Sequence, residues 1–244
     1  MSLDKYLNKI TCGDCYELIK ELPDHSIDCI YTDIPYLIED GGCGSSEVAK
    51  RIIKIQKQEL ADIRSGIDME ILNEFVRVMK KINCFIWCSK LQIYDIMKFF
   101  CEMPQRINFE ILTWNKSNPT PQTNNVWLPD IEYCLYFRET GVRVNDGYEY
   151  KSKWYTSPIN KKDKDSLEHP TIKPLPLVKR HLLHTTQPND IVLDLFVGSG
   201  TTCVAADDIG RQYIGFEINE KWAKIASDRL NNIDAKGQMS LFAR

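Results

Sequence analysis

The chain has 244 residues, a formal net charge of −3 at pH 7 and 43% hydrophobic residues. This length allows one substantial core but is short for two full domains, and the hydrophobic content excludes a disordered chain. No run approaches the roughly 18 to 20 consecutive apolar residues of a membrane helix, and residues 1–10 carry no secretory signal, so we expect a cytoplasmic protein with no membrane partner.

Short apolar runs alternate with segments of helical periodicity along most of the chain, a pattern typical of a parallel α/β sheet. The first part predicts strands over residues 10–12, 27–32 and 84–88 and helices over 16–22, 47–81 and 91–101. In the predicted helix 47–81, the side chains of Ile71, Phe75, Val76 and Met79 share one face.

The second part begins with two apolar runs, residues 107–114 and 131–137, which predict the strands of a closing antiparallel hairpin. Alternation resumes later, with helices over 174–186, 201–209 and 220–231 and strands over 191–196 and 212–216.

The periodicity is lost over residues 139–168, which are polar and basic and are our candidate for a small recognition insert. We therefore expect one α/β domain built from residues 1–138 and 169–236, with a short tail over 237–244. The lysines of the insert surround two aromatic residues, a composition that suits a nucleic-acid surface but also an ordinary solvated loop; they are Lys151, Lys153, Lys161, Lys162 and Lys164.

Nine cysteines occur in the chain, and their setting argues against a disulfide framework. Several lie in apolar segments as small core residues. Cys12 and Cys15 form a C-x-x-C pair without a second pair or a downstream histidine pair, so we expect reduced thiols and no metal site.

A glycine turn follows the predicted strand that ends near Phe196 and precedes a helix, in the order Asp194-Leu-Phe-Val-Gly-Ser-Gly-Thr-Thr. Glycines let the backbone approach a ligand, and the helix N-terminus offers free N–H groups. The next strand ends at Glu217, at the spacing from which an acid reaches ribose hydroxyls, although this residue could equally cap the next helix. A third glycine is missing and Asp194 lies inside the strand, which argues against a nicotinamide dehydrogenase.

A second motif, Asp33-Ile34-Pro35-Tyr36, directly follows a predicted strand. Methylation of a base amino group requires acceptors around the NH₂ group, because its lone pair is delocalised into the ring. A carboxylate and a backbone carbonyl can supply those acceptors, and an aromatic ring can hold a base that has left the duplex. The four residues contain all three groups.

The sequence resembles the β-group of DNA amino-methyltransferases, in which a D-P-P-Y motif precedes the glycine motif that binds S-adenosylmethionine (SAM). Gly13-Asp14-Cys15 with Leu18 resembles the G-D-C-x-x-x-L segment, Trp114-Asn-Lys116 with Asn118 and Pro119 the W-x-K-x-N-P segment, and residues 169–174 the H-P-T-x-K-P segment. These matches span residues 10–220 in the family's order.

The resemblance implies a Rossmann-like SAM-dependent methyltransferase fold, with a mostly parallel sheet and a terminal antiparallel hairpin. It implies that SAM binds at Asp14, Cys15, Thr171, Lys173, Asp194, Phe196, Gly198, Ser199, Gly200, Thr201, Thr202 and Glu217, and that Asp33, Ile34, Pro35 and Tyr36 are catalytic. The expected DNA contacts are Lys116, Lys151, Lys153, Lys161 and Lys162. Lys173 is expected on the methionine side of SAM, with cover of an apolar surface by its stem as the alternative.

An acid at the head of the motif resembles adenine-N6 enzymes, so we expect methylation of a flipped adenine in duplex DNA. Methylation of cytosine N4 is the alternative, and RNA or protein methylation, or a binding module without turnover, are the others. Ile34 departs from the family motif, which has proline there. An inactive relative that still binds DNA is the reading that this departure leaves open.

The tail contains Gln238-Met-Ser-Leu241-Phe242, which resembles the peptide that binds the bacterial sliding clamp. In that reading Leu241 and Phe242 insert into a hydrophobic pocket and Gln238 fixes the register; packing of both apolar residues on the parent domain is the alternative. A recognition segment this small also makes a homodimer plausible.

Overall fold

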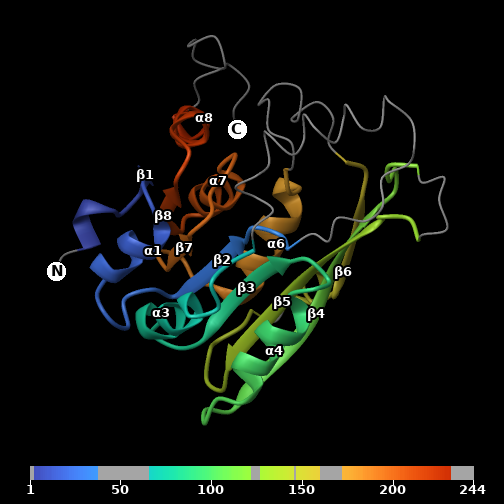
Figure 1. Ribbon diagram of the computed structural model, residues 1–244, viewed down its shortest axis with the longest axis horizontal. Helices are drawn as coiled ribbons and strands as arrows, with labels where there is room; N and C mark the ends of the chain where they lie inside the picture. Colours follow the sequence, from blue (N-terminus) through green and yellow to red (C-terminus); the bar gives the residue numbers. More distant parts are fainter. Residues whose placement is uncertain (1–2, 38–65, 122–126, 146, 160–171, 232–244) are drawn as a thin grey trace.

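The computed structural model describes residues 3–37, 66–121, 127–145, 147–159 and 172–231 (Figure 1). Within these ranges, no helix has the length and apolar character needed to cross a membrane.

The described residues form one eight-stranded sheet in the order β1-β8-β7-β2-β3-β5-β4-β6. The pairs from β1 to β3 are parallel, while β5 is antiparallel to both β3 and β4. The strands are β1 (Lys9–Cys12), β2 (Cys29–Asp33), β3 (Asn83–Cys88), β4 (Ile107–Lys116), β5 (Ile131–Glu139), β6 (Trp154–Ser157), β7 (Ile191–Asp194) and β8 (Gln212–Glu217).

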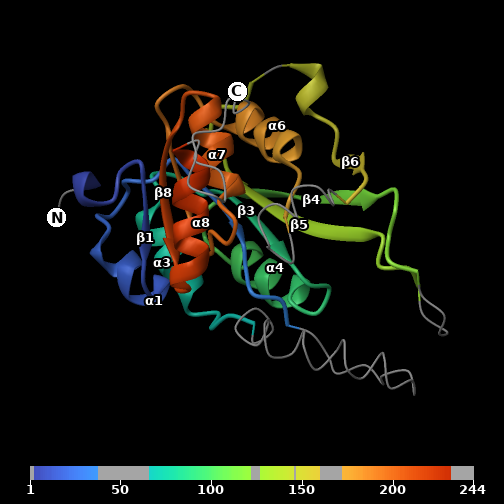
Figure 2. The same cartoon turned by 90° about the horizontal axis from the view of Figure 1, so that it is seen from above.

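Helices cover both faces of the sheet, as Figures 1 and 2 show. One face is covered by α1 (Cys15–Leu18), α3 (Ile71–Val78) and α4 (Ile93–Cys101), and the other by α6 (Leu175–Thr185), α7 (Thr201–Asp208) and α8 (Glu220–Leu230). Short 3-10 turns occur at Leu3–Lys5, Ile19–Glu21 and Tyr148–Tyr150. The Rossmann-like α/β fold expected from the sequence is therefore confirmed.

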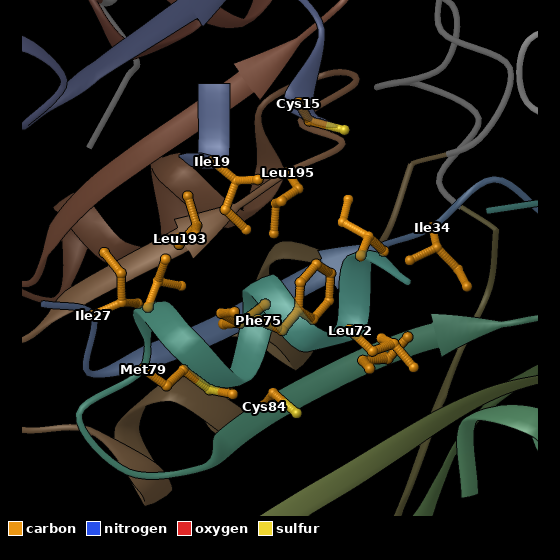
Figure 3. Close-up of a cluster of buried hydrophobic side chains, with 14 of the residues drawn as sticks. Cys15, Ile19, Ile27, Ile34, Leu72, Phe75, Met79, Cys84, Leu193 and Leu195 are labelled. Atoms are coloured by element: carbon orange, nitrogen blue, oxygen red, sulfur yellow. The ribbon is translucent and has the colours of Figure 1, made fainter. Parts of the chain in front are cut away.

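Two hydrophobic clusters lie on the two faces of the sheet, because successive side chains of a strand point in opposite directions. On β2, Ile30 belongs to the cluster under α1, α3 and α4, while Cys29 and Tyr31 belong to the cluster under α6 and α7. Figure 3 shows part of the first cluster, with Phe75 between the sheet and α3 and with Ile34 at its edge. Burial on both faces explains why the central strands are nearly continuous apolar runs.

Two segments differ from the sequence prediction. The expected hairpin forms, but β6 pairs in parallel with β4 and lies outside it, so the hairpin does not end the sheet. This strand comes from the 139–168 segment and was missed because it is short, polar and only half-buried. The helix predicted over 47–81 is described only from residue 66, and there it spans Ile71–Val78, after which Met79 is extended and bridges to Ile27.

Candidate functional site

A cavity of about 550 Å³ opens at the carboxyl ends of the central strands, the expected ligand position in an open α/β sheet. Both motifs found in the sequence line it. The glycine turn after β7 and the end of β8 line one part, and the segment after β2 lines the other. The fold therefore joins residues that lie more than 150 positions apart in the sequence.

The glycine turn has the backbone conformation that the sequence predicted. Gly198 and Gly200 have φ values of 51° and 85°, a region that side chains with a Cβ rarely adopt. A Cβ on Gly200 would also lie 2.9 Å from the Cβ of Ala226, so this glycine lets α8 pack against the turn. From α8, the Arg229 guanidinium donates to the Ser199 carbonyl and to the Thr201 hydroxyl, both at 3.0 Å.

Two acids predicted to bind the cofactor also hold the turn in place. One oxygen of the buried Asp194 carboxylate accepts from the Thr32 hydroxyl at 2.9 Å and from the Phe196 N–H at 3.1 Å. Burial raises the pKa of Asp194 to about 7. Glu217 accepts from the Gly198 N–H at 2.7 Å and from the Asn219 N–H at 3.0 Å.

Most of the other predicted cofactor residues line the same cavity. Asp14 caps α1 by accepting from the Tyr16 N–H at 2.9 Å, and Cys15 is buried beside it. Phe196, Ser199, Thr201 and Thr202 complete the cofactor part, together with Ile218 and Trp222, which sequence reasoning did not include. Thr171 lies outside the described residues.

The catalytic motif continues the edge of β2. Ile34 is 1% exposed, and its N–H donates to the Trp87 carbonyl at 3.2 Å, which adds one more bond to the β2–β3 pairing. Proline has no N–H and cannot make this bond. Isoleucine at this position therefore adds a hydrogen bond that the D-P-P-Y motif would lack. The Pro35 carbonyl accepts from the Gln92 amide at 2.9 Å, which anchors the motif to the segment before α4.

Four charged side chains form a continuous chain at the floor of the cavity. Glu132 on β5 accepts from the Lys116 ammonium at 2.7 Å and from the Lys173 ammonium at 2.9 Å. Lys173 also binds one oxygen of Asp33 at 2.5 Å and lies 3.2 Å from the Tyr36 hydroxyl. The other oxygen of Asp33, Oδ1, is buried and has no hydrogen-bond partner within the described part of the chain.

The electrostatics of this chain follow from burial and pairing. Burial by itself would raise the pKa of Glu132, but Lys173 and Lys116 outweigh it and lower that pKa to about 2. Removal from water raises the pKa of Asp33, although Lys173 opposes the shift. The two carboxylates outweigh the burial of Lys173 and raise its pKa above the ordinary value, so its ammonium stays charged.

Two lysines occupy positions that the sequence reasoning did not assign to them. Lys116, expected to contact DNA, is a partly buried partner of Glu132 and is not among the described residues that line the cavity. Lys173, expected on the methionine side of SAM, lines the cavity but its ammonium is held by Asp33 and Glu132. The expected roles of Lys116 toward DNA and of Lys173 toward SAM stay predictions.

The other lysines expected to contact DNA lie either at the exposed edge of the sheet or outside the described residues. Lys153 pairs with Glu110 at 2.5 Å on the exposed edge of the sheet, and Lys151 lies near it in the turn before β6. Lys161, Lys162 and the clamp residues Gln238, Leu241 and Phe242 lie outside the described residues.

Glu132 is a further residue of the cavity lining that sequence reasoning did not include. It is the second residue of an apolar strand, where a charged side chain facing a sheet interior calls for a partner. That irregularity was a usable signal, but the identity of its partners depends on the register of β4 and β5.

Comparisons with known proteins show the family to which the chain belongs. The DNA methylase family, N6_N4_Mtase, matches residues 27–228. The chain belongs to this family of SAM-dependent DNA amino-methyltransferases, so it is a site-specific DNA methyltransferase.

Individual relatives extend the match over nearly the whole chain. The chain is 32% identical to Type II methyltransferase M2.LlaDCHI of Lactococcus lactis subsp. cremoris, over 90% of this chain and 87% of that protein. It is 30% identical to Type II methyltransferase M2.DpnII of Streptococcus pneumoniae, over 92% and 91%.

Solved structures share the fold. The M1.HpyAVI–SAM complex has a TM-score of 0.69 and 25% identity, over 91% of this chain and 98% of that one. PvuII DNA methyltransferase, described as cytosine-N4-specific, has a TM-score of 0.68 over 93% and 88%; at 17% identity it shows the fold alone.

Proposed function

We propose that this DNA methyltransferase transfers its methyl group to N6 of an adenine flipped out of duplex DNA. The observation that carries the proposal is Asp33 Oδ1, a buried acceptor with no hydrogen-bond partner among the described residues; it belongs to the head of the D-x-P-Y motif, and Asp33 lines the same cavity as the glycine turn. A buried acceptor without a partner is costly, and an exocyclic N–H group would satisfy it.

The residues around the glycine turn fit SAM. Phe196, Ile218 and Trp222 supply an apolar wall suited to an adenine ring, and Asp14 and Glu217 supply carboxylates suited to hydroxyl groups. When bound, SAM supplies an activated methyl group on a positively charged sulfur. We propose that these five residues contact SAM.

The protein's own part in the reaction is to bind and polarise the amino group. Asp33 Oδ1 and the Ile34 carbonyl accept its N–H groups, which draws the nitrogen towards tetrahedral geometry and localises its lone pair. The Tyr36 ring stacks on the flipped base and excludes water. The raised pKa of Asp33 also makes its carboxylate a better acceptor for the proton that the nitrogen loses.

The duplex must approach the carboxyl edge of the sheet, where the cavity opens. The connection between β4 and β5 begins at this edge, because β4 is parallel to the central strands and ends there. Its described part carries Trp127, which is 97% exposed, and Leu128, and it leads within five residues to Glu132 on the cavity floor. An exposed aromatic side chain beside a base pocket suits stacking on the DNA that the base leaves.

The deciding experiment identifies the methylated nucleoside. Purified protein is incubated with unmethylated genomic DNA and isotope-labelled SAM, the DNA is digested, and the product is identified by mass spectrometry. Labelled N6-methyladenine supports the proposal, and labelled N4-methylcytosine replaces adenine by cytosine with the same acceptor chemistry. No labelled nucleoside, with SAM binding intact, indicates an inactive relative.

Three further proposals rest on the sequence alone. We propose that the enzyme acts in the cytoplasm and that its tail binds the sliding clamp through Gln238, Leu241 and Phe242, near replication forks. Deletion of residues 238–244 should abolish clamp binding and leave methylation of free DNA intact. We also propose a homodimer, in which two chains together would offer twice the small recognition surface of one chain. Light scattering tests whether it forms.

A further inference from the structure

Lys173 has two acidic partners and one hydroxyl neighbour within hydrogen-bond distance. Its ammonium lies 2.5 Å from Asp33 Oδ2, 2.9 Å from Glu132 Oε2 and 3.2 Å from the Tyr36 hydroxyl. The side chain is 8% exposed, and its pKa stays above the ordinary value. An ammonium has three donors, and these three oxygens account for all of them.

The pairing divides the two oxygens of Asp33 between two tasks. Lys173 binds Oδ2, and Oδ1 is left as a buried acceptor without a partner. A carboxylate held at one oxygen has a fixed plane, so the direction of the free oxygen is also fixed. Such preorganisation is what an acceptor for a reacting amino group needs.

Glu132 determines where the Lys173 ammonium lies. Its side chain is 16% exposed and it is held from the opposite side by Lys116, whose ammonium binds Glu132 Oε1 at 2.7 Å. Lys116 is on β4, Glu132 on β5 and Asp33 on β2, so the chain of charges crosses the sheet over β3. Two positive and two negative groups alternate in it, which lets each buried charge have an opposite neighbour.

We propose that Glu132 is a positioning residue of the methyltransferase, which holds Lys173 so that Lys173 fixes the orientation of the Asp33 carboxylate, with Lys116 holding Glu132 in turn. The inference rests on the proposed function, since it assigns Asp33 Oδ1 to the target amino group. It gives Lys173 a role toward the catalytic acid in place of the role toward SAM.

The test separates these two roles of Lys173 by measuring SAM affinity and turnover independently. Lys173→Met removes the charge and keeps the length of the side chain. SAM affinity is measured by the quenching of tryptophan fluorescence, since Trp87 and Trp222 line the cavity. Turnover on an oligonucleotide duplex is measured at saturating SAM between pH 5 and 9.

The proposal predicts that Lys173→Met lowers kcat by about 10²-fold, the cost of a misplaced catalytic group, with SAM affinity unchanged. It also moves the acid limb of the kcat profile upwards by about one to three pH units, because Asp33 loses its opposite charge. Among the described residues, the other titratable groups that interact electrostatically with Asp33 are Tyr31 on β2, Tyr36 after β2, Cys88 on β3, Glu132 and Cys134 on β5 and Asp194 on β7. None of these replaces the lost positive charge.

Glu132→Gln and Lys116→Met test the outer part of the chain. Both variants should lower kcat with SAM affinity unchanged. Lys116→Arg should have a kcat near that of the wild type, because arginine retains the positive charge that pairs with Glu132. Asp208→Asn is the matched control, because it breaks an ion pair between Lys179 and Asp208 on the helical surface, away from the cavity. It should leave both measurements unchanged.

The proposal is overturned if Lys173→Met weakens SAM binding while kcat at saturating SAM stays near the wild-type value. It is also overturned if folded Glu132→Gln turns over at the wild-type rate. Should Lys173→Met not fold, as judged by circular dichroism, Lys116→Met against Lys116→Arg carries the same test. If wild-type protein methylates no adenine, the proposed function fails; if it does and the variants behave like the control, only the present inference fails.

Discussion

Replacement of Ile34 by proline restores the family's D-P-P-Y motif and tests what the departure contributes. The Ile34 N–H donates to the Trp87 carbonyl at 3.2 Å, and both residues are buried. Proline removes the donor and leaves a buried carbonyl without that partner, which costs about 1–3 kcal/mol. Because the carbonyl of residue 34 is retained, we expect Ile34→Pro to lower the free energy of unfolding by about 2 kcal/mol and to retain methyl transfer.

The assay for this variant is urea denaturation followed by fluorescence, together with turnover on duplex DNA. Ile34→Val is the matched control, since it keeps the N–H and removes one methylene, at about 0.5–1.5 kcal/mol. A proline variant as stable as wild type would show that the bond to Trp87 contributes nothing. A stable proline variant without turnover would refute the assignment of the residue 34 carbonyl as an acceptor.

Three other substitutions probe different parts of the molecule. Asp33→Ala should abolish methyl transfer while SAM still binds; substantial residual turnover would remove the role given to this carboxylate. Trp127→Ala should weaken duplex binding in a gel-shift assay without changing SAM affinity, and equal DNA affinity would contradict its contact with DNA. Burial lowers the pKa of His181 to about 3, so the folded state holds the neutral ring and loses stability as pH falls below about 6.5. The Tyr31 hydroxyl lies 3.1 Å from His181 Nδ1, so His181→Phe should be less stable than wild type at pH 7. In urea titrations, the difference in the free energy of unfolding between the two proteins should narrow towards pH 4.5. A difference that stays constant with pH would be inconsistent with a buried neutral histidine.

The fold could be predicted from the sequence wherever a strand or helix is defined by its own residues. The central strands are apolar runs because both of their faces are buried, and the glycine turn is readable because Gly198 and Gly200 adopt positive φ. The edge strand Trp154–Ser157 was not predictable in this way. It is a strand because β4 is beside it, and its own half-exposed pattern resembles a loop.

The site was predictable to the same extent. Asp33 and Tyr36 were identified because they are adjacent in the sequence and follow a strand, so local order alone brings them to the sheet edge. The protein partners of Lys116 and Lys173 were not predicted, because the partner of a long charged side chain is decided by tertiary packing. The Lys116 ammonium reaches Glu132 only because β4 and β5 pair antiparallel, which places these strands side by side.

A family motif can be located correctly in a sequence while other residues that its chemistry depends on are not recognised. A motif of adjacent residues identifies the group that we propose to touch the substrate, here the Asp33 carboxylate. A buried carboxylate also needs a neighbouring positive charge to stay ionised, and nothing requires that charge to be close in sequence. In this chain it comes from Lys173, 140 residues away, and it is held by Glu132, which belongs to none of the recognised motifs. Positioning residues of this kind are therefore best sought among buried ion pairs that touch the catalytic acid.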